Sequence, residues 1–213
     1  MEDHGTLPYD AVVLAGGAAR RLSGADKPGL SMGGTTLLDR VLAACAGAAT
    51  TVVVGPRRAT VRPVEWTREQ PPGGGPLPAL AAGLDLVRQE TVVVLAADLP
   101  FVGTGTVSAL LSALGRDPGA EGAVVVDSSG RDQPLLAAYR TEPLRRELAL
   151  LAAEHGTLTG LPMRLLAAGL VLHRTADSTG SAFDCDTWDD VRTARARLAG
   201  NPHRPETGED RGA

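Results

Sequence analysis

A group of residues suited to binding phosphate follows the first apolar segment of the chain. Lys27 is the only lysine among 213 residues, and Gly16, Gly17 and Arg21 precede it in a stretch rich in glycine and arginine. Glycine lets the backbone approach a ligand closely, and ammonium and guanidinium groups form charge-assisted hydrogen bonds with phosphate oxygens. Pro28 follows Lys27 where a P-loop requires serine or threonine, and no G-x-G-x-x-G follows the apolar segment. The stretch predicts a triphosphate site of another kind, whereas an isolated lysine would indicate only a solvated surface position.

A carboxylate follows another apolar segment. Asp98 stands in the sequence Ala-Asp-Leu-Pro, directly after the run 91–96. Ligands of open α/β sheets bind beyond the carboxyl ends of the strands. Magnesium is held by one or two carboxylates together with phosphate oxygens and water. Asp98 is therefore a candidate Mg²⁺ ligand beside the triphosphate, and the alternative is that it only caps a helix or forms a turn.

The segments that must position these residues are of two alternating kinds. Short apolar runs predict strands buried on both faces, and segments with apolar residues three and four positions apart predict helices. The predicted strands are 10–15, 51–54, 91–96, 123–126 and 135–139, and the predicted helices are 37–46, 76–87, 104–114, 143–153 and 187–199. This alternation predicts an α/β fold with a mainly parallel central sheet. We expect one domain over residues 8–199 and a disordered polar tail over 200–213.

Composition narrows the class of protein. A hydrophobic fraction of 43% is enough for one sizeable core, and a net charge of −4 argues against nucleic-acid binding, which requires a broad basic face. The first residues are acidic, and no apolar segment is long enough for a signal peptide or a membrane span. Cys45 and Cys185 are isolated in the sequence and form no C-x-x-C pair, so neither a zinc site nor a disulfide framework is indicated. We expect a cytoplasmic protein with neither a nucleic-acid nor a membrane partner.

The first stretch resembles a known family. Leu14-Ala15-Gly16-Gly17, Arg21, Asp26 and Lys27 are similar to the N-terminal signature of the molybdenum cofactor guanylyltransferases, although Ser23 stands where that family usually has glycine. The resemblance implies a three-layer, Rossmann-like nucleotidyltransferase fold with a mainly parallel sheet. Sugar-1-phosphate and cytidylyl transferases share a looser version of the signature, which therefore indicates nucleotidyl transfer more strongly than any one acceptor.

The resemblance also implies roles for individual residues. Arg21, Lys27 and Asp98 would be catalytic, and Mg²⁺ would be held by Asp98. The nucleotide would be contacted by Leu14, Ala15, Gly16, Gly17, Lys27, Gly75, Pro76, Leu77 and Asp98. The segment Gly75-Pro76-Leu77 would hold the base, unless it is a plain turn before a helix. Arg131 and Gln133 would bind the acceptor, unless they belong to a hydrophilic hairpin turn.

The last motif departs from the family. Asp184-Cys185-Asp186-Thr187 stands where the guanylyltransferases often carry asparagines. We predict Asp186 as a second metal ligand and Thr187 as a helix N-cap, with Asp190 completing a capping box. The departure leaves open which nucleotide is used and how many metal ions are bound.

The resemblance implies one activity and leaves two others open. The expected activity is Mg²⁺-dependent transfer of GMP from GTP to the terminal phosphate of molybdopterin, with release of pyrophosphate and with transient contacts to molybdenum cofactor biosynthesis proteins or molybdoenzymes. One alternative is a transferase that uses CTP or another nucleotide, with molybdopterin or a sugar or polyol phosphate as acceptor. The other is a non-catalytic nucleotide-binding accessory protein.

Overall fold

A computed structural model describes residues 7–16 and 26–200 of the chain. The predicted contacts of Gly17 and Arg21, and all of the tail predicted over 200–213 except Gly200, lie outside this described part. Within it, no helix is long and apolar enough to cross a membrane.

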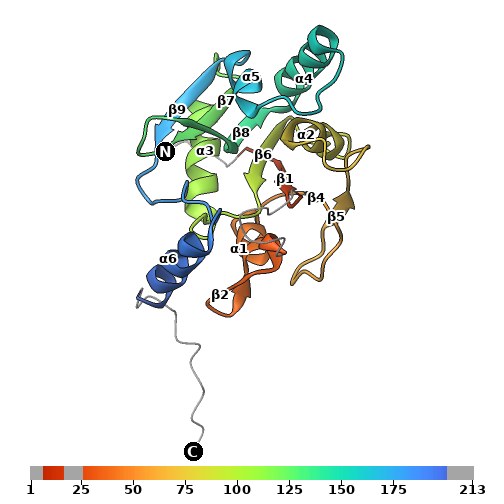
Figure 1. Cartoon of the computed structure of the whole chain (residues 1–213). Helices are drawn as coiled ribbons and strands as arrows, with labels where there is room; N and C mark the ends of the chain where they lie inside the picture. The colour runs from red at the N-terminus through yellow and green to blue at the C-terminus, as the bar shows by residue number, and fades with distance from the viewer. Residues whose placement is uncertain (1–6, 17–25, 201–213) are drawn as a thin grey trace, which may run out of the picture.

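A seven-stranded sheet forms the centre of the molecule, with the order β5-β4-β1-β6-β8-β7-β9 (Figure 1). Its strands are β1 (Asp10–Leu14), β4 (Thr51–Val54), β5 (Glu65–Thr67), β6 (Thr91–Ala96), β7 (Gly122–Val126), β8 (Asp132–Arg140) and β9 (Leu172–Ala176). Strand β8 runs antiparallel to β6 and β7, and the other pairings are parallel. The prediction of an α/β fold with a mainly parallel sheet is confirmed.

Helices cover both faces of this sheet because alternate residues of each strand point to opposite sides. In β1, Ala11 and Val13 belong to one core and Val12 and Leu14 to the other. Helices α1 (Leu37–Ala44) and α3 (Thr104–Arg116) pack on the first core, and α2 (Pro76–Leu84), α4 (Thr141–His155) and α5 (Met163–Ala168) pack on the second (Figure 1). The molecule therefore has the three layers that the resemblance implied.

A smaller apolar cluster joins the remaining elements. It packs α6 (Trp188–Ala199) against the hairpin of β2 (Ser31–Met32) and β3 (Thr35–Thr36), with Met32, Leu37 and Val191 buried between them. Thr187 caps α6, and its backbone N–H donates to Asp190, which completes the predicted capping box. The N-cap Thr187 directly follows Asp186, so the capping box fixes the backbone next to Asp186.

The predicted elements exist, with shifted ends. Helices α1 and α2 end at Ala44 and Leu84, earlier than expected, and β8 begins at Asp132 rather than 135. Strands β5 and β9, the β2–β3 hairpin and the short helix α5 were not predicted. Strand β9 is an exposed edge strand, so its sequence lacks the apolar run that marks a buried strand.

One buried carboxylate ties three strands together at the amino edge of the sheet. Asp10 is 1% exposed and accepts backbone N–H bonds from Thr50 at 2.9 Å, from Arg88 at 2.7 Å and from Gln89 at 3.0 Å. These donors lie just before β4 and β6, the two neighbours of β1. Asp10 therefore fixes how the three strands start, and hence where their carboxyl ends lie.

Candidate functional site

The predicted nucleotide segments meet at the carboxyl ends of β1 and β6. A pocket of about 320 Å³ opens there, lined by Leu14, Gly16, Glu69, Gly73, Gly75, Pro76, Ala79, Ala96, Asp98 and Leu135. Two glycines make this convergence possible. At Gly55, after β4, a Cβ would lie 2.8 Å from the backbone of Ala15, and at Gly83 of α2 a Cβ would lie 2.6 Å from Val12. Larger residues would push the β4 loop and α2 away from β1.

Lys27 lies between the two predicted metal ligands, Asp98 and Asp186. Its Nζ is 2.5 Å from Oδ2 of Asp98 and 2.7 Å from Oδ1 of Asp186. The Lys27 side chain is 15% exposed, against 23% for Asp98 and 44% for Asp186. Burial alone would lower the pKa of Lys27, but the two carboxylates outweigh it and the pKa is raised. The ammonium is therefore held charged between carboxylates that come from two well-separated parts of the sequence.

A third carboxylate makes this centre acidic. Burial raises the pKa of Asp184, and the nearby charges of Asp186 and Asp98 raise it further. The backbone N–H of Cys185 donates to the carbonyl oxygen of Asp98 at 3.2 Å, which joins the two loops. Burial also raises the pKa of the Cys185 thiol to about 12, so this thiol is not a nucleophile. Among the described residues, the Lys27 ammonium therefore stands near the carboxylates of Asp98, Asp184 and Asp186.

The carboxylate oxygens fit magnesium better than a transition metal. Among the described residues, no three His, Cys, Asp and Glu side chains are grouped so that they could hold a metal ion by themselves. Magnesium needs only one or two carboxylates, because phosphate oxygens and water complete its shell. Asp98 and Asp186 share a cation already, so they are close enough to share a metal in its place.

The turn before α2 forms the other side of the pocket. Gly75 caps α2 with φ of 101°, a conformation that favours glycine, and Pro76 and Pro78 lack N–H groups, so Leu77 carries the one amide donor of the first three helical positions. The side chain of Leu77 is fully buried in the core. Leu77 can therefore reach a ligand only through its backbone, and the same holds for Ala15, which is 1% exposed.

Glu69 is a pocket residue that no motif of the sequence pointed to. It is 8% exposed, it lines the pocket, and its Oε1 accepts the N–H of Gly73 at 2.8 Å. A carboxylate rarely tolerates such burial without partners. Its place before the Pro-Gly turn is a signal in the sequence, but a carboxylate before a turn indicates no particular role by itself.

Arg131 and Gln133 lie in a turn that Asp127 closes. Asp127 accepts from the hydroxyl of Ser129, from the backbone N–H of Arg131 and from Nε2 of Gln133 at 2.7 Å. These bonds, that of Ser129 foremost, lower the pKa of Asp127 to about 2. Neither Arg131 nor Gln133 lines the pocket, whereas Leu135, further along β8, does. The turn lies at the same edge of the sheet as Asp98, because the start of β8 pairs with the end of β6.

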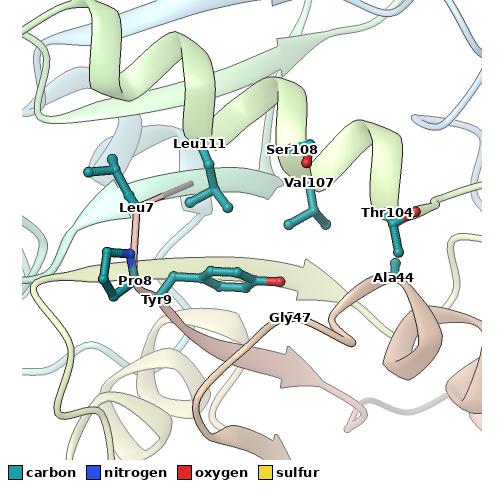
Figure 2. A pocket seen from close by; sticks show the side chains of 9 residues that line it. All are labelled: Leu7, Pro8, Tyr9, Ala44, Gly47, Thr104, Val107, Ser108 and Leu111. Carbon is teal, nitrogen blue, oxygen red and sulfur yellow. The ribbon is translucent and has the colours of Figure 1, made fainter. Parts of the chain in front are cut away.

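A second hollow, of about 350 Å³, lies between α3, the end of α1 and the segment that leads into β1 (Figure 2). Figure 2 shows the ring of Tyr9 in this hollow, facing Val107 and Leu111. Burial raises the pKa of the Tyr9 hydroxyl, and the lining residues include no carboxylate and no basic side chain. The chemistry-bearing residues gather at the first pocket instead.

Comparisons with known proteins agree with this arrangement. The family model of the MobA-like NTP transferase domain matches residues 11–169. A probable molybdenum cofactor guanylyltransferase of Chloroflexus aggregans is 32% identical over 206 residues, which cover 90% of this chain and 96% of that protein. A protein of the same description from Mycobacterium bovis BCG is 34% identical over 164 residues, covering 73% and 80%.

Solved structures share the fold. The molybdopterin-guanine dinucleotide biosynthesis protein A of Archaeoglobus fulgidus superposes with a TM-score of 0.70 at 23% identity, covering 89% of this chain and 98% of that one. The 2-C-methyl-D-erythritol 4-phosphate cytidylyltransferase of Thermus thermophilus superposes with a TM-score of 0.67 at 22% identity, covering 91% and 100%. Because a molybdopterin-guanine dinucleotide biosynthesis protein and a cytidylyltransferase share this fold, the fold alone does not select the nucleotide.

Proposed function

The chain belongs to the MobA-like NTP transferase family, and from that premise we propose that it transfers GMP from GTP to the terminal phosphate of molybdopterin. It is a nucleotidyltransferase of molybdenum cofactor biosynthesis. The observation that carries the proposal is the position of Lys27, bound to Asp98 and Asp186, with Asp98 also lining the pocket between Gly16 and the start of α2. This pocket offers a place for a base and sugar beside a place for phosphates and a metal.

The proposed reaction is an in-line displacement. An oxygen of the acceptor phosphate forms a bond to the α-phosphorus of GTP, and the bond from that phosphorus to the bridging oxygen breaks, so that pyrophosphate leaves with the electron pair. The acceptor oxygen is already anionic, so the chain need not supply a catalytic base. The work of the residues is to align the two phosphates and to neutralise the developing charge.

Lys27 and Arg21 are proposed to supply the neutralising charges, with Lys27 donating to phosphate oxygens once the nucleotide has entered. Asp98 and Asp186 would hold Mg²⁺, which when bound supplies further positive charge to the phosphates. Gly16 gives the phosphates close access to the backbone at the end of β1. Removing one such contact typically lowers the rate on the order of 10²–10³-fold.

Glu69 supports guanine over cytosine. Guanine carries two neighbouring N–H donors on its Watson–Crick edge, and one carboxylate can accept both of them. Cytosine has a single amino donor beside an acceptor nitrogen, which a carboxylate would repel. Glu69 lines the pocket, and the N–H of Gly73 uses only one of its acceptor sites.

A nucleotide panel tests the proposal. Pyrophosphate release is measured with GTP, CTP, ATP and UTP, each with and without molybdopterin. We expect release with GTP that depends on both Mg²⁺ and molybdopterin. Faster acceptor-dependent release with CTP would make the chain a cytidylyltransferase, and nucleotide binding without release under any condition would make it an accessory protein.

A further inference from the structure

Arg58, in the loop that follows β4, reaches across the carboxyl edge of the sheet to the segment of Lys27. Its Nε donates to Oδ1 and Oδ2 of Asp26 at 2.8 and 3.0 Å, and its Nη2 donates to Oδ1 at 2.6 Å. Its Nη1 donates to the carbonyl oxygens of Pro56 at 2.7 Å and of Ala15 at 3.3 Å. One guanidinium therefore joins the loop after β4, the end of β1 and the residue that precedes Lys27.

This arrangement uses the particular shape of arginine. The planar fork binds a carboxylate through two nitrogens while the third nitrogen remains available for carbonyl groups, which a lysine ammonium cannot do with the same geometry. The Arg58 side chain is 18% exposed although Asp26 is 56% exposed, so the arginine is the inner member of the pair. In an ordinary surface ion pair both side chains are exposed and contribute little to stability, whereas Arg58 is mostly buried.

The bonds between Arg58 and Asp26 affect the position of Lys27. Asp26 is its immediate neighbour, and the carbonyl of Asp26 accepts the N–H of Gly29, which starts the short 3-10 helix η2 (Lys27–Gly29). The N–H of Leu30 likewise donates to the carbonyl of Lys27 at 3.1 Å. The side chain of Asp26 makes no capping bond to this helix, so its carboxylate serves Arg58 instead.

We propose that Arg58 is a positioning residue for the transfer reaction: by holding Asp26 against the end of β1, it sets the place from which the Lys27 ammonium reaches the phosphates. This inference rests on the proposed role of Lys27. It assigns Arg58 no contact with the substrate. Misplacing a reacting group by about 1 Å can cost on the order of 10²-fold in rate, so the expected loss is large.

The kinetic test compares Arg58→Ala with Arg57→Ala, the adjacent exposed arginine. Arg58→Ala should lower kcat about 10- to 100-fold and change KM for GTP by less than about threefold, and Arg57→Ala should leave both near wild type. Asp26→Ala should reproduce the Arg58→Ala loss, and the double variant should be no worse than either single one. In a Lys27→Met background, Arg58→Ala should have an effect of less than about twofold, because it acts through Lys27. Equal losses in both backgrounds would assign Arg58 to general stability and overturn the proposal.

A second readout does not depend on the reaction. Hydrogen exchange of the Gly29 and Leu30 amides should quicken about tenfold or more in Arg58→Ala and Asp26→Ala, while that of the Leu37 amide, bonded to Leu30 at 3.0 Å, changes less. Unchanged exchange at Gly29 and Leu30 would show that the bonds between Arg58 and Asp26 do not hold η2 in place, and would overturn the proposal. If the wild-type protein transfers no nucleotide while this exchange pattern is observed, the proposed function fails, but the role of the Arg58–Asp26 bonds in holding η2 is supported.

Discussion

Replacing Lys27 with methionine should tighten the binding of a divalent cation while it slows nucleotidyl transfer. Methionine has a similar length and lacks the ammonium that bonds Asp98 at 2.5 Å and Asp186 at 2.7 Å. In the wild-type protein without nucleotide, the ammonium competes with the metal for these two carboxylates. In the variant the Lys27 ammonium no longer competes with the metal for these carboxylates.

The size of the effect follows from the charges. Two unit charges about 4 Å apart interact by about 1 kcal/mol at the dielectric constant of water, so an ammonium about 4 Å from a divalent ion repels it by about 2 kcal/mol. That energy corresponds to roughly 30-fold in affinity. Salt weakens the repulsion, because the carboxylates are partly exposed, so about tenfold is expected near physiological ionic strength.

The assay is a titration with Mn²⁺ as a spectroscopic substitute for Mg²⁺, without nucleotide. Arg116→Met is the matched control, since it removes the same charge from an exposed residue at the far end of α3. We expect about tenfold tighter Mn²⁺ binding in Lys27→Met, a change of less than twofold in the control, and a rate of transfer lower on the order of 10²–10³-fold in Lys27→Met alone. Unchanged or weaker Mn²⁺ binding in Lys27→Met would show that the ammonium and the metal do not share Asp98 and Asp186.

Four further changes test other parts of the site and the fold. Asp98→Asn should abolish Mg²⁺-dependent turnover and weaken binding of a fluorescent GTP analogue by less than about tenfold, because the amide keeps the shape and removes the charge; surviving magnesium dependence would reduce Asp98 to a turn residue. Asp186→Asn should stay active at saturating Mg²⁺ with a less steep dependence of initial rate on Mg²⁺ concentration; an unchanged profile with a lower melting temperature would assign Asp186 to the start of α6. Glu69→Gln should raise KM for GTP about tenfold and leave KM for CTP nearly unchanged in steady-state assays, and equal changes for both would remove Glu69 from base recognition. Asp10→Asn should lower the free energy of unfolding by about 2–4 kcal/mol in urea titrations, because an amide nitrogen would face buried N–H donors, while the exposed Asp85→Asn stays within about 0.5 kcal/mol; a loss below about 1 kcal/mol for Asp10→Asn would contradict its role in aligning the strands.

The sequence predicted the buried part of the fold well because burial leaves a strong pattern. Strands such as β6, apolar on both faces, and helices such as α1, with one apolar face, produce patterns that few other structures share. Strands β5 and β9 lie at the two edges of the sheet and carry polar and charged residues. Each of these strands is held by hydrogen bonds to a single neighbouring strand, and such pairing leaves no recognisable pattern in the local sequence.

The residues of the candidate site were predictable where they lie next to a predicted strand or helix in the sequence. Asp98 and Gly75 lie at the ends of predicted segments, and both line the pocket. Arg58 and Glu69 lie in the irregular segments around β5, and only the folded chain shows what they contact. The bonds of Lys27 to Asp186 also join distant parts of the chain, which spacing alone cannot reveal.

The most direct test of the proposed function follows the two ends of GTP separately. GTP labelled at the α-phosphorus and GTP labelled at the γ-phosphorus are each incubated with the protein, molybdopterin and Mg²⁺, and the products are separated and identified by mass. We predict that the α label appears in a molybdopterin guanine dinucleotide and the γ label in pyrophosphate, in equal amounts, and that Lys27→Met yields neither product at a comparable rate. An α label that stays in GTP, or that appears only in free GMP, would contradict the transfer that we propose.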